Sequence, residues 1–161
     1  MKDAVLQVPE YHAVVLREQP LAHSLCVLDT PERAFEFIQG NVKSSPRFTP
    51  NVENFCVLFL NTRRRCTGWH VTSTGTLDTL LVHPREVFRT AIMIGAAALL
   101  LAHNPSGDPS PSEADIKVTR DLIRAGQLLK IEVLDHLVVG DLPLPGVRQW
   151  ASLRELGYFN S

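Results

Sequence analysis

The sequence has little of what several classes of protein require. Its three cysteines, Cys26, Cys56 and Cys66, are odd in number and form no Cys-x-x-Cys pair, which argues against a disulfide framework and against a cysteine zinc site. The longest wholly apolar run, residues 96–102, is too short to span a bilayer. The first twenty residues contain no signal-peptide core. These absences favour a protein of the reducing cytoplasm.

Neither sign of charge dominates the chain. The formal net charge is −1, so no global attraction to nucleic acid or to an anionic membrane is expected. The basic run Arg63-Arg64-Arg65 is either a local basic patch or, as we favour, a solvated hairpin turn. The 161 residues, 45% of them apolar and 20% charged, are enough for one soluble domain with its own core.

Hydrophobic periodicity and turn residues predict a layered α/β domain with a mixed β-sheet. Strands are expected at residues 12–16, 55–60, 66–74, 97–102 and 131–139, with a short extended piece at 79–82. Helices are expected at residues 31–40, 84–95, 111–125 and 147–156. We expect Gly40 and Gly126 to end the first and third of these helices. The strands at 55–60 and 66–74 are expected to form a hairpin.

Two parts of the chain are distinguished by this pattern. Residues 1–29 are interpreted as an N-terminal strand and extension, and residues 30–161 as one domain. No internal repeat and no long linker divides the larger part.

The segment HNPSGDPSPS, which begins at His103, follows a buried strand. Ligand sites in α/β sheets tend to lie beyond the carboxyl ends of strands. Its prolines and glycine make the segment stiff, as a site that must hold its geometry requires. A histidine and an aspartate here are able to face one pocket, and imidazole and carboxylate are ordinary zinc ligands.

On the residues alone, a structural interpretation of this segment is favoured over a metal site. Ser110, Pro111 and Glu113 match a helix capping box. Ser112 and Asp115 are then first-turn residues that favour the helix dipole. His103 is then a hydrogen-bonded structural group at the end of a strand.

Three segments carry a family resemblance: ENFCVLFLNTRRR, VHPREVFRTAIMIGAAALLLAHNPSGDPSPSEAD and AGQLLKIEVLDHLVVGD. They resemble motifs of the RadC family of JAB/MPN domains, over about residues 30–141. The resemblance implies a JAB/MPN fold, which is cytidine-deaminase-like, and a zinc-dependent hydrolase of the metallopeptidase or isopeptidase type acting on a peptide or protein. It also implies a short form, without the helix-hairpin-helix region of longer relatives.

The family signature assigns roles to four residues of this chain. In members with the full signature, a glutamate is followed by His-x-His, seven residues, serine, two residues and aspartate. There the two histidines and the aspartate bind zinc, and the glutamate is the general base toward zinc-bound water. Carried over, Glu53 is the general base, His103 and Asp115 are zinc ligands, and Ser112 helps to stabilise the oxyanion.

One zinc ligand of the signature is missing, because this chain has AHNPSG where the family has AHNHPSG. Counting back from Ser112 places Asn104 at the second histidine and Ala102 at the first. Counting forward from Pro84 makes His103 the first histidine and deletes the second. We favour the second alignment, because the preceding helix and strand match without a gap. Asn104 offers a carbonyl oxygen, which is a weak zinc donor.

Three functions are therefore compared. The near-complete signature favours a zinc-dependent hydrolase, and the missing ligand favours an impaired pseudoenzyme or interaction module. A DNA-repair role rests on the family label alone, and the net charge argues against direct DNA binding. His136 matches a family histidine outside the signature and is expected to form a structural hydrogen bond near the sheet. His83 is expected to line the same edge.

Overall fold

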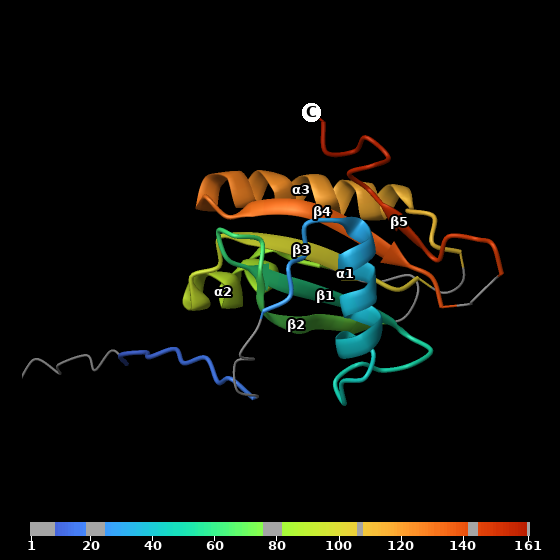
Figure 1. The fold of residues 1–161 in the computed structure, drawn as a ribbon. Helices are drawn as coiled ribbons and strands as arrows, with labels where there is room; N and C mark the ends of the chain where they lie inside the picture. Colours follow the sequence, from blue (N-terminus) through green and yellow to red (C-terminus); the bar gives the residue numbers. More distant parts are fainter. Residues whose placement is uncertain (1–8, 19–24, 76–81, 106–107, 142–144, 161) are drawn as a thin grey trace, which may run out of the picture.

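A five-stranded mixed sheet forms the centre of the molecule (Figure 1). The computed structural model describes residues 9–18, 25–75, 82–105, 108–141 and 145–160. In strand order β2-β1-β3-β4-β5, the strands are β2 (Cys66–Gly75), β1 (Glu53–Leu60), β3 (Ala98–His103), β4 (Glu132–Val139) and β5 (Trp150–Ser152). Strands β3 and β4 run parallel, and the other neighbouring pairs are antiparallel. The expected mixed sheet and the β1–β2 hairpin are confirmed.

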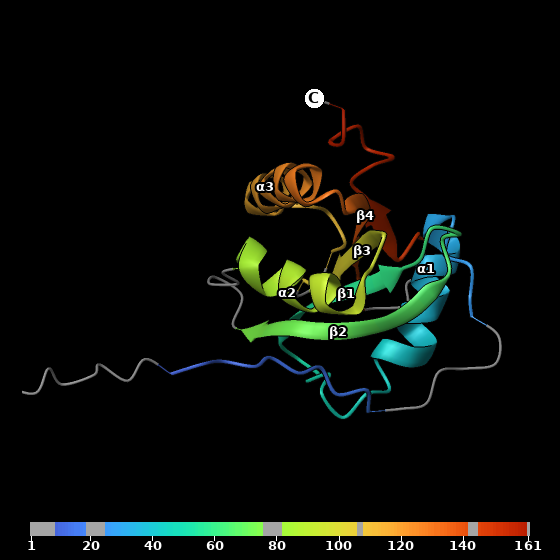
Figure 2. The ribbon, with the colours of Figure 1, turned by 90° about the vertical axis from the view of Figure 1, so that its left-hand side faces the viewer.

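Helices cover both faces of this sheet (Figure 2). Helix α1 (Pro31–Phe37), continued by the π-helical turn η1 (Ile38–Val42), lies on one face, and α2 (Pro84–Ile94) and α3 (Glu113–Leu129) lie on the other. Both α1 and α2 begin with a capping side chain followed by proline, Thr30-Pro31 and His83-Pro84. Among the described residues, no helix combines the length and the apolar character needed to cross a membrane.

Strand alternation divides the core into two layers, because successive side chains point to opposite faces. The layer toward α1 contains Cys56, Leu58, Leu60, Ala98, Leu100 and Ala102. The layer toward α2 and α3 contains Phe55, Val57, Phe59, Leu99 and Leu101. The two central strands are thus buried on both faces, and they read as continuous apolar runs for that reason.

A β-bulge in β4 changes which of its side chains face α3. Leu99 pairs with Val133, but Leu100 pairs with Asp135, so Leu134 is an extra residue on β4. A slip of one residue moves every later side chain to the opposite face. His136 therefore points toward α3, where Asp135 would lie in a regular strand.

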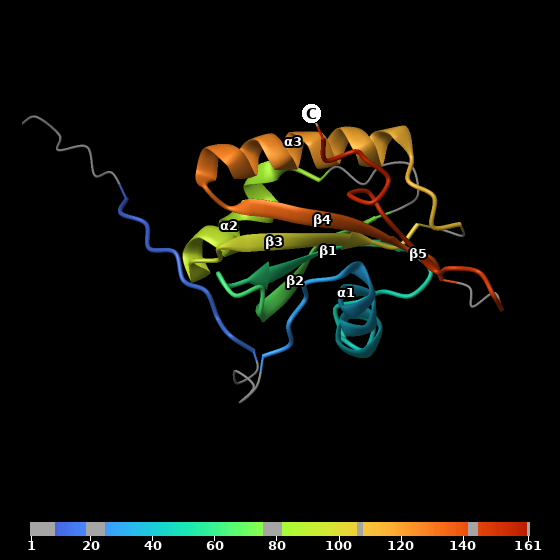
Figure 3. The same cartoon turned by 45° about the horizontal axis from the view of Figure 1, so that its top comes forward.

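Helix α3 is the crossover between the parallel strands β3 and β4 (Figure 3). The expected helix end at Gly126 is wrong, since the helix continues to Leu129 and closes at Lys130 in a left-handed conformation with φ 57°. Gly126 serves a different purpose: a Cβ at this position would lie 2.4 Å from the carbonyl oxygen of Ile131. The helix is thus able to approach the start of β4 closely.

Three other sequence predictions are corrected, and a fourth is not tested. Residues 12–16 form no strand and lie exposed outside the sheet. Gly40 lies inside the π-helical turn and ends no helix. The helix expected at 147–156 is replaced by β5 and a series of turns, because Trp150 pairs with Val139 and is buried in the α1-side layer. The extended piece at 79–82 falls almost wholly outside the described residues.

Replacing Gly126 with alanine tests the close approach of α3 to β4. Gly126→Ala is expected to lower the free energy of unfolding by about 1–3 kcal/mol, since the added methyl group meets backbone that cannot rotate away. Gly40→Ala is the matched control, because no atom lies within 4 Å of its added Cβ. Urea unfolding of both variants measures the difference. Equal stability of the two would show that α3 has room for a side chain there.

Candidate functional site

The site begins at His103, the last residue of β3. Because Leu99 and Leu101 face α3, alternation places the His103 side chain on the same face. The residue is 4% exposed. Its ring stacks on Phe55, the opposite residue of β1, with an interplanar angle of 13°. The histidine is therefore held by an aromatic contact as well as by its strand.

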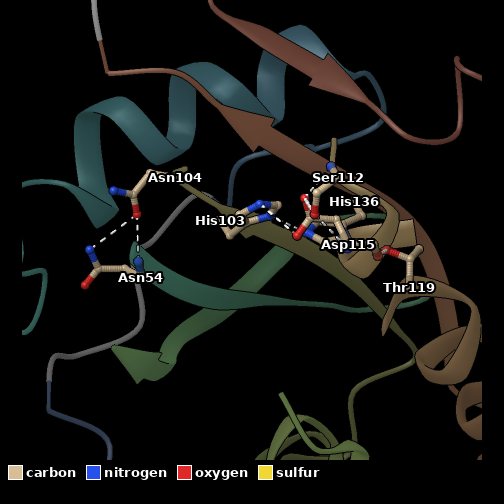
Figure 4. A network of polar contacts seen from close by, with 7 residues as sticks. All are labelled: Asn54, His103, Asn104, Ser112, Asp115, Thr119 and His136. Atoms are coloured by element: carbon tan, nitrogen blue, oxygen red, sulfur yellow. Dashed lines mark hydrogen bonds and ion pairs between the residues drawn. The ribbon is translucent and has the colours of Figure 1, made fainter. Parts of the chain in front are cut away.

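A chain of buried hydrogen bonds leads from His103 into the molecule (Figure 4). His103 Nδ1 lies 2.8 Å from His136 Nε2, and His136 Nδ1 lies 2.6 Å from Thr119 Oγ1. The Thr119 hydroxyl donates to the backbone carbonyl oxygen of Asp115 over 2.6 Å. His136 and Thr119 are 1% and 0% exposed. The structural hydrogen bond expected for His136 thus joins it directly to the candidate ligand His103.

Asp115 closes this chain on its other side. Its Oδ1 lies 3.3 Å from His103 Nε2. Its Oδ2 accepts hydrogen bonds from the backbone N–H and the hydroxyl of Ser112, both over 2.7 Å. We call His103, His136, Thr119 and Asp115 the four-residue network; Figure 4 shows it at the junction of β3, β4 and α3.

The capping box of α3 is formed by different residues from those expected. Ser112 is the N-cap, its hydroxyl accepts from the Asp115 N–H over 3.2 Å, and Asp115 is the reciprocal acceptor. Ser110 instead contacts Asp108. The prediction that Ser110 and Glu113 form the capping box is therefore wrong. Both hydrogen-bonding functions of the Ser112 hydroxyl are already in use within this cap.

Electrostatics of the network favour a charged Asp115 and a neutral His136. Burial acts to raise the pKa of Asp115, but the hydrogen bond and charge of His103 and the hydrogen bonds from Ser112 outweigh it, so that this pKa lies well below its usual range. Burial, followed by the neighbouring His103 charge, holds the pKa of His136 well below its ordinary value. His136 is therefore a neutral ring at physiological pH.

Asn104 is not brought to this network. Its Oδ1 accepts from the Asn54 backbone N–H over 2.8 Å, and its Nδ2 donates to the Val52 carbonyl over 3.0 Å. In Figure 4 its amide points toward Asn54 and away from the gap between His103 and Asp115. The Asn104 side-chain oxygen, which was considered as a weak metal donor, instead accepts a hydrogen bond at the start of β1.

Glu53 lies at the same end of the sheet as His103. It is the first residue of β1 and is half-buried. Phe55 pairs with His103, and alternation along β1 places Glu53 on the same face as Phe55. The candidate general base therefore lies on the same face of the sheet, and at the same end of its strands, as the His103–Asp115 pair.

The remaining histidine and cysteine candidates have local roles. His83 caps α2, where its Nδ1 accepts from the Arg85 N–H over 3.2 Å. Burial raises the pKa of the Cys56 thiol to about 12 and that of Cys66 to about 11. Thiols with such pKa values are poor nucleophiles and poor metal ligands at neutral pH.

Two residues of the site escaped the sequence-based search. Thr119 stands four residues after Asp115 on α3, a spacing that puts both on one side of a helix, so this signal was present. Asp135 accepts hydrogen bonds from the His136 N–H, the Arg154 N–H and the Ser152 hydroxyl, and thereby holds the bulge of β4 against β5. Nothing in the sequence marked that role.

The donor atoms fit a zinc site in part. Two ligand atoms at about 2.0–2.1 Å from zinc, in tetrahedral arrangement, lie about 3.3–3.4 Å apart. The separation of His103 Nε2 and Asp115 Oδ1 is 3.3 Å, longer than the roughly 2.7–2.9 Å of a charge-assisted hydrogen bond. However, the described residues contain no group of three histidine, cysteine or acidic side chains placed to hold a metal. A site with three protein ligands therefore does not fit the described chain.

His136 does not supply the missing ligand, although it is adjacent. Its Nε2 is directed at His103 Nδ1, and its Nδ1 is directed at Thr119. Neither ring nitrogen is left to face the gap between His103 and Asp115.

The fold, with a histidine at the end of β3 and an aspartate in the first turn of α3, defines an α/β domain of the JAB class. A family model described as the RadC-like JAB domain matches residues 28–158. The chain therefore belongs to the RadC-like JAB domain family.

The similar proteins described next are named UPF0758 proteins, and that name states no activity. A UPF0758 protein of Bacillus pumilus is 41% identical over 133 residues, which cover 82% of this chain and 54% of the relative. One of Moorella thermoacetica is 56% identical over 90 residues, covering 55% and 39%, and one of Symbiobacterium thermophilum is 49% identical over 115 residues, covering 70% and 47%. The chain thus spans about half the length of these curated relatives.

Removing the Asp115 charge tests its place in the network. Asp115→Asn is expected to lower the free energy of unfolding at neutral pH by about 1–3 kcal/mol, because the ion pair with His103 and the charge of the acceptor in the Ser112 hydrogen bonds are lost. A carboxyl with a depressed folded-state pKa stabilises the fold above its unfolded-state pKa, and this contribution is lost as the pH falls toward the folded-state value. The difference from wild type should therefore shrink below about pH 4.

Urea unfolding at neutral and acidic pH measures this effect. Asp121→Asn on the exposed side of α3 is the control, with an expected change within about 0.5 kcal/mol. An Asp115→Asn difference that is the same at both pH values would show that the charge of Asp115 does not stabilise the fold.

Proposed function

We propose that this protein is a RadC-family member of the zinc-dependent hydrolase type whose centre is impaired by the lack of one histidine ligand. The single observation that carries the proposal is the His103–Asp115 pair, whose donor atoms have the separation of zinc ligands while no third ligand accompanies them in the described chain. Such a site binds zinc weakly. What persists is a folded domain that acts mainly by binding a peptide or protein.

The impairment follows from the chemistry of the donors. Loss of a partner that only supports a ligand typically weakens metal affinity by about 10- to 100-fold, and loss of a ligand itself is expected to weaken it further. Asn104 does not compensate, because its amide is engaged with Asn54 and Val52. Ser112 and Asp115 are also stable without a metal, since they complete the cap of α3.

A competent zinc-dependent hydrolase of peptide or isopeptide bonds is the second candidate. It is favoured by the 3.3 Å separation of His103 Nε2 and Asp115 Oδ1, and by the position of Glu53 on the same face and at the same end of the sheet. In this candidate His103 and Asp115 hold the metal, Glu53 is the general base and Ser112 assists at the oxyanion. It requires a third ligand from outside the described residues or from a partner.

We propose a protein or peptide partner in preference to a nucleic acid. Two residues of the basic run in the β1–β2 turn are engaged within the fold: Arg64 forms an ion pair with Glu132 over 2.9 Å, and the Arg65 guanidinium donates a hydrogen bond to the Leu25 carbonyl. Together with a net charge of −1, this leaves little basic surface for phosphate.

Inserting a histidine between Asn104 and Pro105 tests the proposal. The insertion recreates the His-x-His sequence of the family, and zinc content should rise from near zero to about one ion per chain, as three protein ligands plus water suit tetrahedral zinc. Elemental analysis of protein expressed with zinc measures the content. An alanine inserted at the same place controls for loop length and should leave the content low.

Two outcomes would count against the impaired centre. Wild-type protein that already carries one zinc per chain would favour the competent hydrolase. An alanine insertion that loads as well as the histidine insertion would show that loop length, and not the missing ligand, limits binding. Asp115→Asn in the histidine-inserted chain should remove the gained zinc, because it removes a ligand of the restored set.

A further inference from the structure

Strand β2 is an edge of the sheet, and its sequence does little to protect that edge. Within the described part of the chain, β2 makes one backbone hydrogen bond outside its pairing with β1: the Cys66 N–H donates to the Cys26 carbonyl over 2.8 Å. The strand, CTGWHVTSTG, contains no lysine, arginine, acidic residue or proline. Natural edge strands commonly carry such residues, because an open row of N–H and C=O groups is a template for another strand.

Two β-bulges define which part of this edge is regular. Thr67 and Thr72 are the extra residues of the bulges, and their hydroxyls donate back to backbone carbonyls of β1. Between them, Gly68–Val71 pairs regularly with β1. Since a bulge itself disturbs strand addition, the open part of the edge is this short stretch, which suits a short added strand.

A segment with the character of such a strand lies outside the sheet. Residues 12–16, HAVVL, are rich in β-branched side chains, which favour strands. In the single chain they nevertheless form no strand. Val14 and Leu16 are 78% and 84% exposed. The local sequence therefore favours a strand for which one copy of the chain provides no partner.

The segment is held close to the open edge. In Figures 1 and 2, residues 9–18 lie beyond β2, at the open side of the sheet. Glu18 forms an ion pair with Arg47. Burial lowers the pKa of His70 on β2, and the charges of Arg47 and Glu18 also act on it, so the end of the segment lies near this strand.

Apolar side chains of β2 offer a surface that an added strand would cover. Trp69 and Val71 are half-buried and pack against the α1-side layer of the core. In an extended segment Val14 and Leu16 point to the same side. Placed beside β2 with that side toward α1, they would extend this layer past Trp69 and remove their own exposed surface from water.

We propose that residues 12–16 of one copy of this chain add as a strand to β2 of a second copy, along Gly68–Val71, and that the exchange is reciprocal. A two-fold axis lets each copy give its segment and receive the other, so that both open edges are filled and the assembly closes. A second copy is the occupant because the segment, although held near its own β2, makes no backbone hydrogen bond with it in the described chain. This interface goes beyond the proposed function and requires no metal.

The native protein tests the exchange by sedimentation and hydrogen exchange. Dimers should form as the concentration rises toward about 1 mM, and N–H groups of residues 12–16 should exchange more slowly in the dimer than in the diluted monomer. A protein that stays monomeric over this range would overturn the proposal. So would a dimer in which this segment exchanges as fast as in the monomer. Slow exchange of the segment in a monomer would show that it pairs with its own β2, and would also overturn it.

Proline substitutions test the segment. Successive N–H groups of a strand point to opposite sides, so Val14→Pro with Val15→Pro removes one donor that faces β2, whichever side that is. Dimerisation should weaken about 10-fold or more. Val14→Thr with Val15→Thr keeps β-branched side chains and both donors, and should retain the dimer. Both variants should fold, because the segment lies outside the core. Equal dimerisation of the two would contradict the proposal.

Substitutions at Gly68 test the edge independently of the segment. The nearest atom to a Cβ added there is in the Phe59 ring, 4.0 Å away, so a side chain fits the fold. Gly68→Lys places a charge on the edge and should weaken dimerisation about 10-fold. Gly68→Thr adds an uncharged, β-branched side chain and should retain the dimer. Dimerisation that is sensitive to the proline variant but unchanged by Gly68→Lys would show that the segment binds elsewhere, and would overturn β2 as its site.

Discussion

The hydrogen bond between His103 and His136 is the interaction on which the candidate site depends. It crosses the parallel pair β3–β4, and through Thr119 and Asp115 it ties both strands to the first two turns of α3. Buried polar groups are costly unless they are paired, and here each of them has a partner. Removing one member leaves its neighbours unsatisfied, so the network stabilises the fold as a unit.

This network is satisfied by its own members and does not need a metal to be stable. The Asp115 carboxylate is charged because His103 and Ser112 favour that form, and Ser112 is at the same time the N-cap of α3. The residues that would hold a metal thus also hold the junction of sheet and helix. In the proposed impaired centre, the lack of one ligand leaves these structural roles of His103, Ser112 and Asp115 intact.

Much of the fold could be predicted because local rules and tertiary packing agree there. The apolar runs of β1 and β3, the hairpin and the proline-led starts of α1 and α2 are examples. Predictions failed where a distant partner decided the outcome. Gly126 was interpreted as a helix end, whereas Ile131 requires a small residue there. The spacing of Trp150 with its neighbours predicted a helix, but Trp150 pairs with Val139, the last residue of β4.

The candidate site also has parts that follow from local sequence and parts that depend on a distant partner. The sequence by itself determined that His103 ends a buried strand on a definite face, and that Ser112 and Asp115 share the first turn of the next helix, because alternation and helical spacing are local properties. Only the tertiary structure decided that His136 faces His103. That outcome depends on the bulge at Leu134, and register is set by the pairing of two strands that are separated along the chain by a whole helix.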